Sequence, residues 1–354
     1  MARPPTRWPA RSSTEPTYVP PLRIGCLGAA RIAPAALIRP AAANDGVQCV
    51  AVAARDRSRA DAFAAKHHIA RVHDTYEALL DDPDLDAVYN PLPNGLHGAW
   101  TIRALQAGKH VLCEKPFTAN AAEARTVAEV AERSGRVVME AFHWRYHPLA
   151  ARMLEVIAGG ELGQVRRIEA ALCFPLPMFG DIRYQLDLAG GAMMDAGCYP
   201  VSMVRTLAGA EPTVVGASAR LRSPGVDRRM EAELSFADGR TAGVLASMWS
   251  STLLRLRIRV IGSAATMRVF NPTNPHMFHR LTVAGSGRRR HERVGGGPTY
   301  GYQLEAFRAA VQDGRPVLTP PRDAVANMAV IDAIYKAAGL GARRPTGVDP
   351  ASAG

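Results

Sequence analysis

The chain has 354 residues, 47% of them hydrophobic and 21% charged, which is a balance typical of soluble globular proteins. This length suits two domains, and no run approaches the roughly 18 consecutive apolar residues that a membrane span needs. The formal net charge is +11, but the cationic residues are scattered and no recognition motif accompanies them. We therefore expect neither a membrane nor a nucleic-acid partner.

Residues 1–21 are rich in Pro and Arg and lack the apolar core of a secretory signal, so they are interpreted as a tail. The next segment, 22–147, alternates short apolar runs with Ala-rich helical stretches. This alternation predicts a doubly wound α/β domain with a parallel sheet, the Rossmann arrangement. The expected strands are 23–27, 47–53, 87–90, 110–113 and 137–140, and the expected helices are 31–43, 58–68, 96–107 and 121–134.

From residue 148 the rhythm changes to longer strand-like runs separated by Gly, Asp and Ser turns. We expect residues 148–341 to form an α+β domain with a large, open, mostly antiparallel sheet, and 342–354 to form a C-terminal tail. The densest basic cluster, 288–290, is expected in a Gly-rich turn of this domain. The expected strands are 164–174, 213–222, 229–236, 241–250, 255–261, 266–270 and 280–283, and the expected helices are 148–158, 302–313 and 322–338.

A Gly-rich loop follows the first predicted strand. Gly28, Ala30 and Ala33 occupy the three positions of the G-x-G-x-x-G/A dinucleotide fingerprint, in the expected strand-to-helix context. The amino end of the following helix would face the pyrophosphate with free N–H groups. The alternative interpretation is a tight turn without a ligand.

The second predicted strand ends in a cationic segment. An NAD enzyme usually has a carboxylate here for the ribose 2′-hydroxyl, whereas this chain has Ala54 followed by Arg55, with Arg59 one helical turn later. Guanidinium groups suit a 2′-phosphate, so NADP is favoured and NAD remains possible. Asp56 complicates this assignment, and the alternative is that Arg55 is merely a solvated strand end.

Two further motifs carry chemistry. Lys115, one of only four lysines, follows a buried strand and would lie at the sheet edge where ligands bind. Asp195 and Tyr199 are four residues apart, so on a helix they share one face. We expect the Lys115 ammonium to lower the pKa of the Tyr199 phenol, which would then act as a base at neutral pH. The alternative is a phenol at the edge of the core with one hydrogen bond.

Five motifs occur in order along the chain, at 25–33, 89–97, 114–116, 140–148 and 190–199. Together they make the chain resemble the glucose-fructose oxidoreductase, inositol dehydrogenase and rhizopine-catabolism (Gfo/Idh/MocA) family over nearly all of residues 22–340. The resemblance implies that the family's catalytic lysine falls on Lys115, its acidic substrate residue on Asp195, and its usual histidine on Tyr199. A tyrosine at that position is similar to the dihydrodiol dehydrogenase, xylose dehydrogenase and glucose-fructose oxidoreductase branch.

The resemblance also implies a set of binding residues. Arg183 and Asp195 would contact the substrate. The implied cofactor-binding residues are Gly28, Ala30, Arg31, Ile32, Arg55, Arg59, Pro91, Leu92, Asn94, His97, Glu114, Lys115, Trp144, Arg145 and Tyr302.

A metal site is not expected. His143 and His147 have zinc-like spacing, but Pro148 disfavours helical geometry at His147 and no third ligand follows.

The resulting hypothesis is an NADP-dependent oxidoreductase that moves a hydride between the nicotinamide and a sugar, cyclic polyol or trans-diol. Copies are expected to associate, as dimers or tetramers, through the C-terminal sheet. Five cysteines without a C-x-x-C pair favour reduced thiols and a cytoplasmic location. The alternatives are a dinucleotide-binding sensor or partner protein without turnover, and an NAD-assisted glycosidase.

Overall fold

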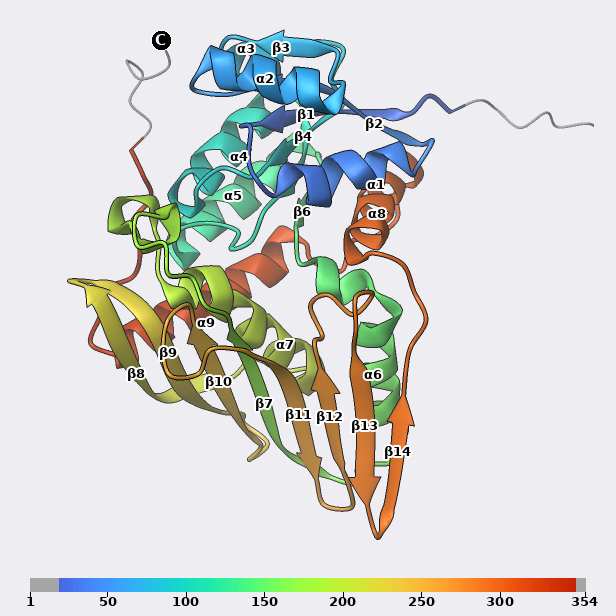
Figure 1. Ribbon diagram of the computed structural model, residues 1–354, viewed down its shortest axis with the longest axis vertical. Coiled ribbons are helices and arrows are strands. Elements are labelled where there is room, and N and C mark those ends of the chain that lie inside the picture. The colour runs from blue at the N-terminus through green and yellow to red at the C-terminus, as the bar shows by residue number, and fades with distance from the viewer. Residues whose placement is uncertain (1–18, 348–354) are drawn as a thin grey trace, which may run out of the picture.

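The computed structural model describes residues 19–347, and our expectations for 1–18 and for 348–354 lie outside the described residues. Two sheets divide the molecule into an upper and a lower part (Figure 1). Both expected sheet types are confirmed. Within the described residues, no helix is long and apolar enough to cross a membrane.

The upper sheet has six strands in the order β3-β2-β1-β4-β5-β6, all parallel. The strand order reverses between the adjacent strands β1 and β4, and ligands of such sheets bind in a crevice at this point, outside the carboxyl ends of the strands. The strands are β1 Leu22–Leu27, β2 Val47–Ala53, β3 Arg71–His73, β4 Ala87–Asn90, β5 His110–Cys113 and β6 Val138–Glu140. The helices are η1 Pro34–Ile38, α1 Arg39–Ala42, α2 Arg57–His67, α3 Tyr76–Leu80, η2 Asn94–Leu96, α4 His97–Gln106 and α5 Ala121–Ser134.

The lower sheet has eight strands in the order β14-β13-β12-β11-β7-β10-β9-β8, and only the β7–β10 pair is parallel. Helices α7 and α9 pack on this sheet, while arginines and glutamates alternate on its strands and pair across them. The strands are β7 Val165–Cys173, β8 Thr213–Ser223, β9 Val226–Ser235, β10 Thr241–Ser247, β11 Arg255–Gly262, β12 Thr266–Phe270, β13 Arg280–Gly285 and β14 Arg288–Glu292. The helices are η3 His143–Tyr146, α6 Pro148–Ala158, η4 Ile182–Tyr184, η5 Leu186–Leu188, η6 Met193–Gly197, α7 Cys198–Ala208, α8 Thr299–Asp313 and α9 Pro321–Ala337.

The last two helices tie the two parts together. Helix α8 packs beside α1 of the upper part, and α9 lies between α5 above and α7 and β8 below (Figure 1). Two helices from the second half of the sequence therefore pack against helices of the upper part.

Four expectations need correction. The first helix begins at Pro34 rather than at 31, because the loop turns through residue 33 and Pro suits a first helical position. Edge strand β3 and helix α3 were not expected, because they are short and only partly buried. The basic residues 288–290 lie in edge strand β14, not in a turn. Exposed cations are a common device at sheet edges, and Arg290 pairs there with Glu161 at 2.8 Å.

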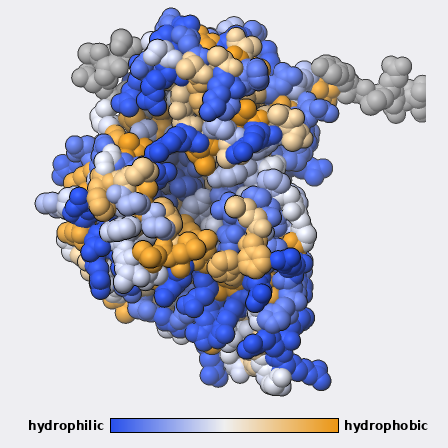
Figure 2. Space-filling model, in the orientation of Figure 1, coloured by the Kyte–Doolittle hydropathy of each residue, from blue (hydrophilic) through white to orange (hydrophobic). Residues whose placement is uncertain are grey.

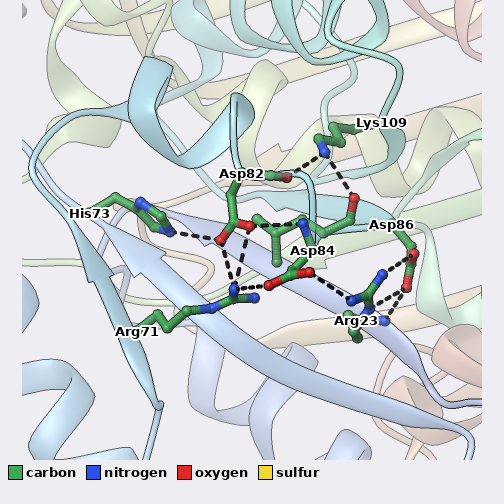
Figure 3. Close-up of polar contacts among 8 residues, drawn as sticks. Arg23, Arg71, His73, Asp82, Asp84, Asp86 and Lys109 are labelled. Carbon is green, nitrogen blue, oxygen red and sulfur yellow. Dashed lines mark hydrogen bonds and ion pairs between the residues drawn. The ribbon is translucent and has the colours of Figure 1, made fainter.

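An ion network closes the amino end of the upper sheet, opposite the crevice (Figure 3). Asp86 accepts from the backbone and guanidinium of Arg23, and Arg71 pairs with Asp82 and Asp84. The ammonium of buried Lys109 donates to the carbonyl oxygens of Asp82 and Leu85 at 2.6 and 2.9 Å, and His73 contacts Asp82. The network joins β1, β3 and the loop before β4, and so fixes the strand order at this end.

The segment 341–347, expected mostly as part of a tail, packs against the rest of the protein. The Arg343 guanidinium lies in the core, where it donates to the Asp227 carboxylate at 2.8 Å and to the Gly190 carbonyl at 2.9 Å. Both side chains are almost fully buried, 2% and 0% exposed. The other oxygen of Asp227 accepts from the amide of Met193, the first residue of η6. The end of the chain thus anchors the turn that precedes Asp195.

Replacing Arg343 with Met leaves the Asp227 carboxylate buried without its cation. We expect the free energy of unfolding to fall by about 3–5 kcal/mol, the usual effect of breaking a buried pair from one side. Chemical denaturation measures this loss. The matched control is R344M, because exposed Arg344 forms no ion pair within residues 19–347 and should change stability by less than about 0.5 kcal/mol. Equal stability of the two variants would contradict this account.

Candidate active site

The loop after β1 offers a cradle for phosphate. Gly28 has φ +96°, a conformation that L side chains rarely adopt, and its amide donates to the Ala53 carbonyl at the end of β2. Within residues 19–347, the amides of 29–32 donate no hydrogen bond. These free amides include those of Ala30 and Ile32, at the start of a helical segment, where an anion is stabilised.

The cationic strand end lies beside this loop. Arg55 and Arg59 are exposed, and neither forms an ion pair in the described part of the chain. The Asp56 carboxylate caps α2 instead, because it accepts from the amides of Ser58 and Arg59 and from the Ser58 hydroxyl. Asp56 is therefore engaged by the helix and does not neutralise the two guanidinium groups by a direct pair.

Arg31 faces away from the amide cradle. Its guanidinium pairs with Asp181 of the lower part at 2.8 Å, so the contact spans the crevice between the two parts. Figure 2 shows the surface hollowed between these halves. Asp181 also binds Arg183 at 3.0 Å. The two ion pairs thereby connect the loop before η4 to the Gly-rich loop of the upper part.

Lys115 follows strand β5, as expected. The preceding Glu114 is buried and accepts from the Tyr89 hydroxyl at 2.7 Å, and burial raises the pKa of its carboxyl. The Lys115 ammonium donates to the backbone carbonyl of Asp195 at 3.3 Å and lies 5.3 Å from the centre of the Tyr199 ring. The two motifs, 80 residues apart in the chain, thus meet in the crevice.

The motif with Asp195 and Tyr199 is helical but begins with a π-helical turn. Asp195 belongs to η6 and Tyr199 to the first turn of α7. Such wide turns often occur at functional sites. The glycines before them let two segments approach closely: a Cβ at Gly190 would lie 2.6 Å from the Arg183 carbonyl, and one at Gly191 would lie 2.2 Å from Asp227.

The Asp195 carboxyl sits among polar partners. The Asn94 amide donates to one of its oxygens at 3.3 Å, and the Arg183 guanidinium lies 3.6 Å from the other. Burial raises the pKa of Asp195 to about 6, while Lys115, Arg183 and Asn94 act in the opposite direction. At neutral pH the group is therefore largely ionised and able to accept a hydrogen bond.

The expected lowering of the Tyr199 pKa is wrong. Burial raises the pKa of this phenol well above its usual value, because the ring is enclosed by the core. Lys115 lies over the face of the ring rather than at its oxygen, and the oxygen instead contacts His143 Nε2 at 2.9 Å. At neutral pH Tyr199 is a neutral phenol, so its proton is available for donation.

The segment after β4 lines the opposite wall. Leu92 lies against Gly28, whose Cβ, if present, would be 3.2 Å from the Leu92 side chain; Pro91 precedes it. His97 is fully buried, with one ring nitrogen 2.7 Å from the Pro116 carbonyl oxygen and the other 2.6 Å from that of Leu92. His97 thus joins this wall to the turn that carries Lys115.

Trp144, Arg145 and Tyr302 are the residues expected beside the nicotinamide, and that role stays a prediction. Trp144 is buried, and its indole N–H has no partner within residues 19–347, while Arg145 pairs with Asp323 at 2.8 Å. Tyr302 lies farther out, with its hydroxyl bound by the Gly297 amide. Tyr300 is the tyrosine that contacts His143, at 4.2 Å between ring centres.

Sequence reasoning missed three contributors, namely Tyr300, Thr299 and Glu140. Tyr300 and Thr299 follow a Gly-rich loop with no motif of their own. Glu140 is the last residue of β6 and belongs to a motif, but the sequence pattern does not show toward which neighbours its side chain points. Its carboxylate accepts from the Phe117 amide at 2.9 Å, and its second oxygen has no partner within the described residues. Burial raises the pKa of Glu140 to about 8.

The chain matches two family models. Residues 22–142 match the oxidoreductase family model with an NAD-binding Rossmann fold, and residues 150–268 match the GFO/IDH/MocA C-terminal domain. Among known proteins, the chain is 40% identical to D-xylose 1-dehydrogenase (NADP(+)) 2 of Haloferax volcanii, over 91% of this chain and 98% of that protein. It is 35% identical to trans-1,2-dihydrobenzene-1,2-diol dehydrogenase of Xenopus tropicalis, over 56% of this chain and 60% of that protein.

Among solved structures, KijD10, a 3-ketoreductase from Actinomadura kijaniata in complex with NADP and TDP-benzene, has a similar fold. Its TM-score is 0.85 at 30% identity, and the match covers 90% of this chain and 98% of that one. The arrangement of two sheets around one crevice is therefore common to this chain and to a structure that holds NADP.

Substitution of Glu140 with Gln tests the buried carboxyl beneath the Lys115 turn. The folded-state pKa of about 8 lies above the ordinary value of 4.5, so the folded protein keeps a proton that the unfolded chain releases. The wild type should therefore lose stability as pH rises from about 4.5 to 8, by roughly 1.4 kcal/mol for each pKa unit. Denaturation across this range should show a flatter profile for E140Q. The control is E132Q, at an exposed position on α5, and a wild-type slope identical to that of E140Q would contradict the prediction.

Proposed function

The chain belongs to the Gfo/Idh/MocA family of oxidoreductases, and on that premise we propose that it is an NADP-dependent enzyme of sugars, cyclic polyols or trans-diols. It would interconvert a hydroxyl and a carbonyl group. The observation that carries the proposal is the convergence of Lys115, Asp195 and Tyr199 at the carboxyl edge of the parallel sheet, from two parts of the fold.

The proposed cofactor fits the residues present. The free amides of 29–32 suit the pyrophosphate, and exposed Arg55 and Arg59 suit a 2′-phosphate because Asp56 is held by its own helix. Glu114, Asn94 and His97 would shape the wall along the nucleotide, with Pro91, Leu92 and Trp144. When bound, NADP supplies or accepts the hydride.

The protein's own residues manage the proton. In the direction of reduction, the Tyr199 phenol would donate its proton to the substrate oxygen, since burial keeps it protonated. The Lys115 ammonium, held by the Asp195 carbonyl, would polarise that oxygen. The Asp195 carboxylate would accept a hydrogen bond from a neighbouring hydroxyl, and Arg183 would hold Asp195 in place.

The substrate class is supported by the relatives. One is a D-xylose 1-dehydrogenase and one a trans-1,2-dihydrobenzene-1,2-diol dehydrogenase, whose named substrates carry neighbouring oxygens, and one is a 3-ketoreductase. An acidic group beside a proton donor suits such vicinal oxygens. Association of copies through the lower sheet stays a prediction.

A panel of aldoses, inositols and cyclic diols with each cofactor tests the proposal. Oxidation of at least one of these with NADP(+), or reduction of its ketone with NADPH, should change the nicotinamide absorbance. No change with any member, despite cofactor binding, would favour the sensor interpretation. Release of sugar from a glycoside, without any net change in nicotinamide absorbance, would favour the interpretation as an NAD-assisted glycosidase.

Replacing Lys115 with Met removes the polarising ammonium and keeps a similar length. We expect kcat to fall by roughly 100-fold or more, because the reacting oxygen loses its cationic partner, while the affinity for NADP stays close to that of the wild type. Steady-state kinetics and fluorescence titration measure the two quantities. The control K66M changes an exposed lysine on α2 and should leave both unchanged. Near-normal turnover by K115M would refute the mechanism.

Replacing Arg55 with Ala tests the 2′-phosphate assignment. We expect the Kd for NADP to rise about 10-fold, the effect of losing one charge-assisted hydrogen bond, and the Kd for NAD to change less than about 2-fold. The matched control is R57A, two residues later, because Arg57 is engaged by Asp61 and Asp74. An unchanged ratio of the two affinities in R55A would remove Arg55 from the cofactor site.

A further inference from the structure

His143 forms a buried chain of hydrogen bonds with two hydroxyl groups. Its Nε2 lies 2.9 Å from the Tyr199 oxygen, and its Nδ1 lies 2.8 Å from the Thr299 hydroxyl oxygen. The ring is 2% exposed and packs against the tilted ring of Tyr300, with 4.2 Å between the ring centres. Sequence reasoning had considered this histidine only as a metal ligand, whereas the structure connects it to the proposed proton donor.

A neutral imidazole carries one N–H, so the chain has two possible orders of donors. In one, Tyr199 donates to Nε2, and Nδ1–H donates to Thr299. In the other, the Thr299 hydroxyl donates to Nδ1, and Nε2–H donates to the Tyr199 oxygen. The first order directs the phenolic proton at the histidine, whereas the second leaves it free for a substrate.

The environment keeps the imidazole neutral throughout. Burial lowers the pKa of His143 to about 3, and Lys115 and His276 contribute in the same direction. If Tyr199 passed its proton to Nε2, a buried imidazolium would form close to the Lys115 ammonium. The ring is therefore neutral in both orders, and what differs is the phenol oxygen. In the first order a phenolate formed by donation to a substrate would face the lone pair of Nε2, whereas in the second order it keeps an N–H donor.

We propose that His143 is a positioning residue for Tyr199, which donates Nε2–H to the phenol oxygen and is itself held in this tautomer by the Thr299 hydroxyl. The phenolic proton then points toward the substrate oxygen. In the direction of reduction the phenol O–H bond breaks, the substrate O–H bond forms, and the phenolate keeps the hydrogen bond from Nε2. Solvent returns the proton to Tyr199 after the product leaves. This role rests on the function proposed above.

Other ionisable groups surround the pair and must be kept constant in a test. Glu114, Glu140, Cys198 and Tyr300 act on the Tyr199 phenol, and all raise its pKa. Lys115 and His276 act on His143. A variant at His143 or Thr299 leaves all six in place, so a changed titration of Tyr199 reports the lost hydrogen bond.

The tautomer can be observed without any turnover. Long-range ¹H–¹⁵N spectra of histidine-labelled protein, assigned by comparison with H143F, should place the single proton of His143 on Nε2. A proton on Nδ1 would overturn the proposal. In T299V, which removes the hydroxyl, the Nε2–H form should lose its dominance, while T299S should keep it. These spectra are independent of whether the substrate class has been identified correctly.

The second experiment measures the pKa of the Tyr199 phenol and the kcat of the enzyme. In H143F the Tyr199 phenolate loses its donor, so its titration, followed by tyrosinate absorbance and assigned with Y199F, should move upward by 1–2 pH units. The kcat at neutral pH should fall about 10- to 100-fold, the range for one hydrogen bond to a charged group, with little change in KM. In H143Q the side-chain amide can donate to the same oxygen, so both the Tyr199 titration and kcat should return part of the way to the wild-type values.

The matched control is His291, which contacts the Thr282 hydroxyl at 2.9 Å in the same way but lies exposed on β14. H291F should change neither the titration of Tyr199 nor kcat. If H143F retains the wild-type titration and rate, the proposal fails. If the wild type turns over no sugar or diol but the titration shifts as stated, the proposed function fails while the link between His143 and Tyr199 stands.

Discussion

The contact between the Lys115 ammonium and the Asp195 carbonyl joins the two halves of the site. One partner ends a buried parallel strand of the upper sheet, and the other lies in a π-helical turn above the lower sheet. Neither half places a complete set of reactive groups by itself. The position of this contact therefore depends on how the two parts of the fold are held, and the segments that hold them are as important as the reactive side chains.

Several of those segments come from the end of the chain. Helix α9 lies between α5 and the lower sheet, and Arg343 reaches into the core to pair with Asp227 beside η6. The Arg31–Asp181 pair spans the crevice on its open side. In this chain, with a net charge of +11, arginines thus hold separate segments together. One planar guanidinium can donate hydrogen bonds to a carboxylate and to a carbonyl oxygen at the same time.

Burial changes the chemistry that the residue types suggest. Tyr199 beside a lysine suggests an acidified phenol, but enclosure by the core raises the phenol's pKa, and Tyr300 and Glu114 act in the same direction. Asp195 keeps more of its charge because Lys115, Arg183 and Asn94 oppose the effect of burial. Tyr199 and Asp195 lie on adjacent turns, but their surroundings differ. As a result Tyr199 is a proton donor and Asp195 is a hydrogen-bond acceptor.

The resemblance to the family predicted the meeting of Lys115 with Asp195 and Tyr199. The sequence by itself determined the two sheet types, most of the strands and longer helices, and the Gly-rich loop after β1. These follow from apolar periodicity, turn residues and motifs, which depend on neighbours along the chain. Only the tertiary structure decided that β14 is a strand, that Arg343 packs into the core, that Tyr300 packs against His143, and which protonation state Tyr199 holds. Those outcomes depend on burial and on contacts between residues far apart in the chain, and no local pattern records them.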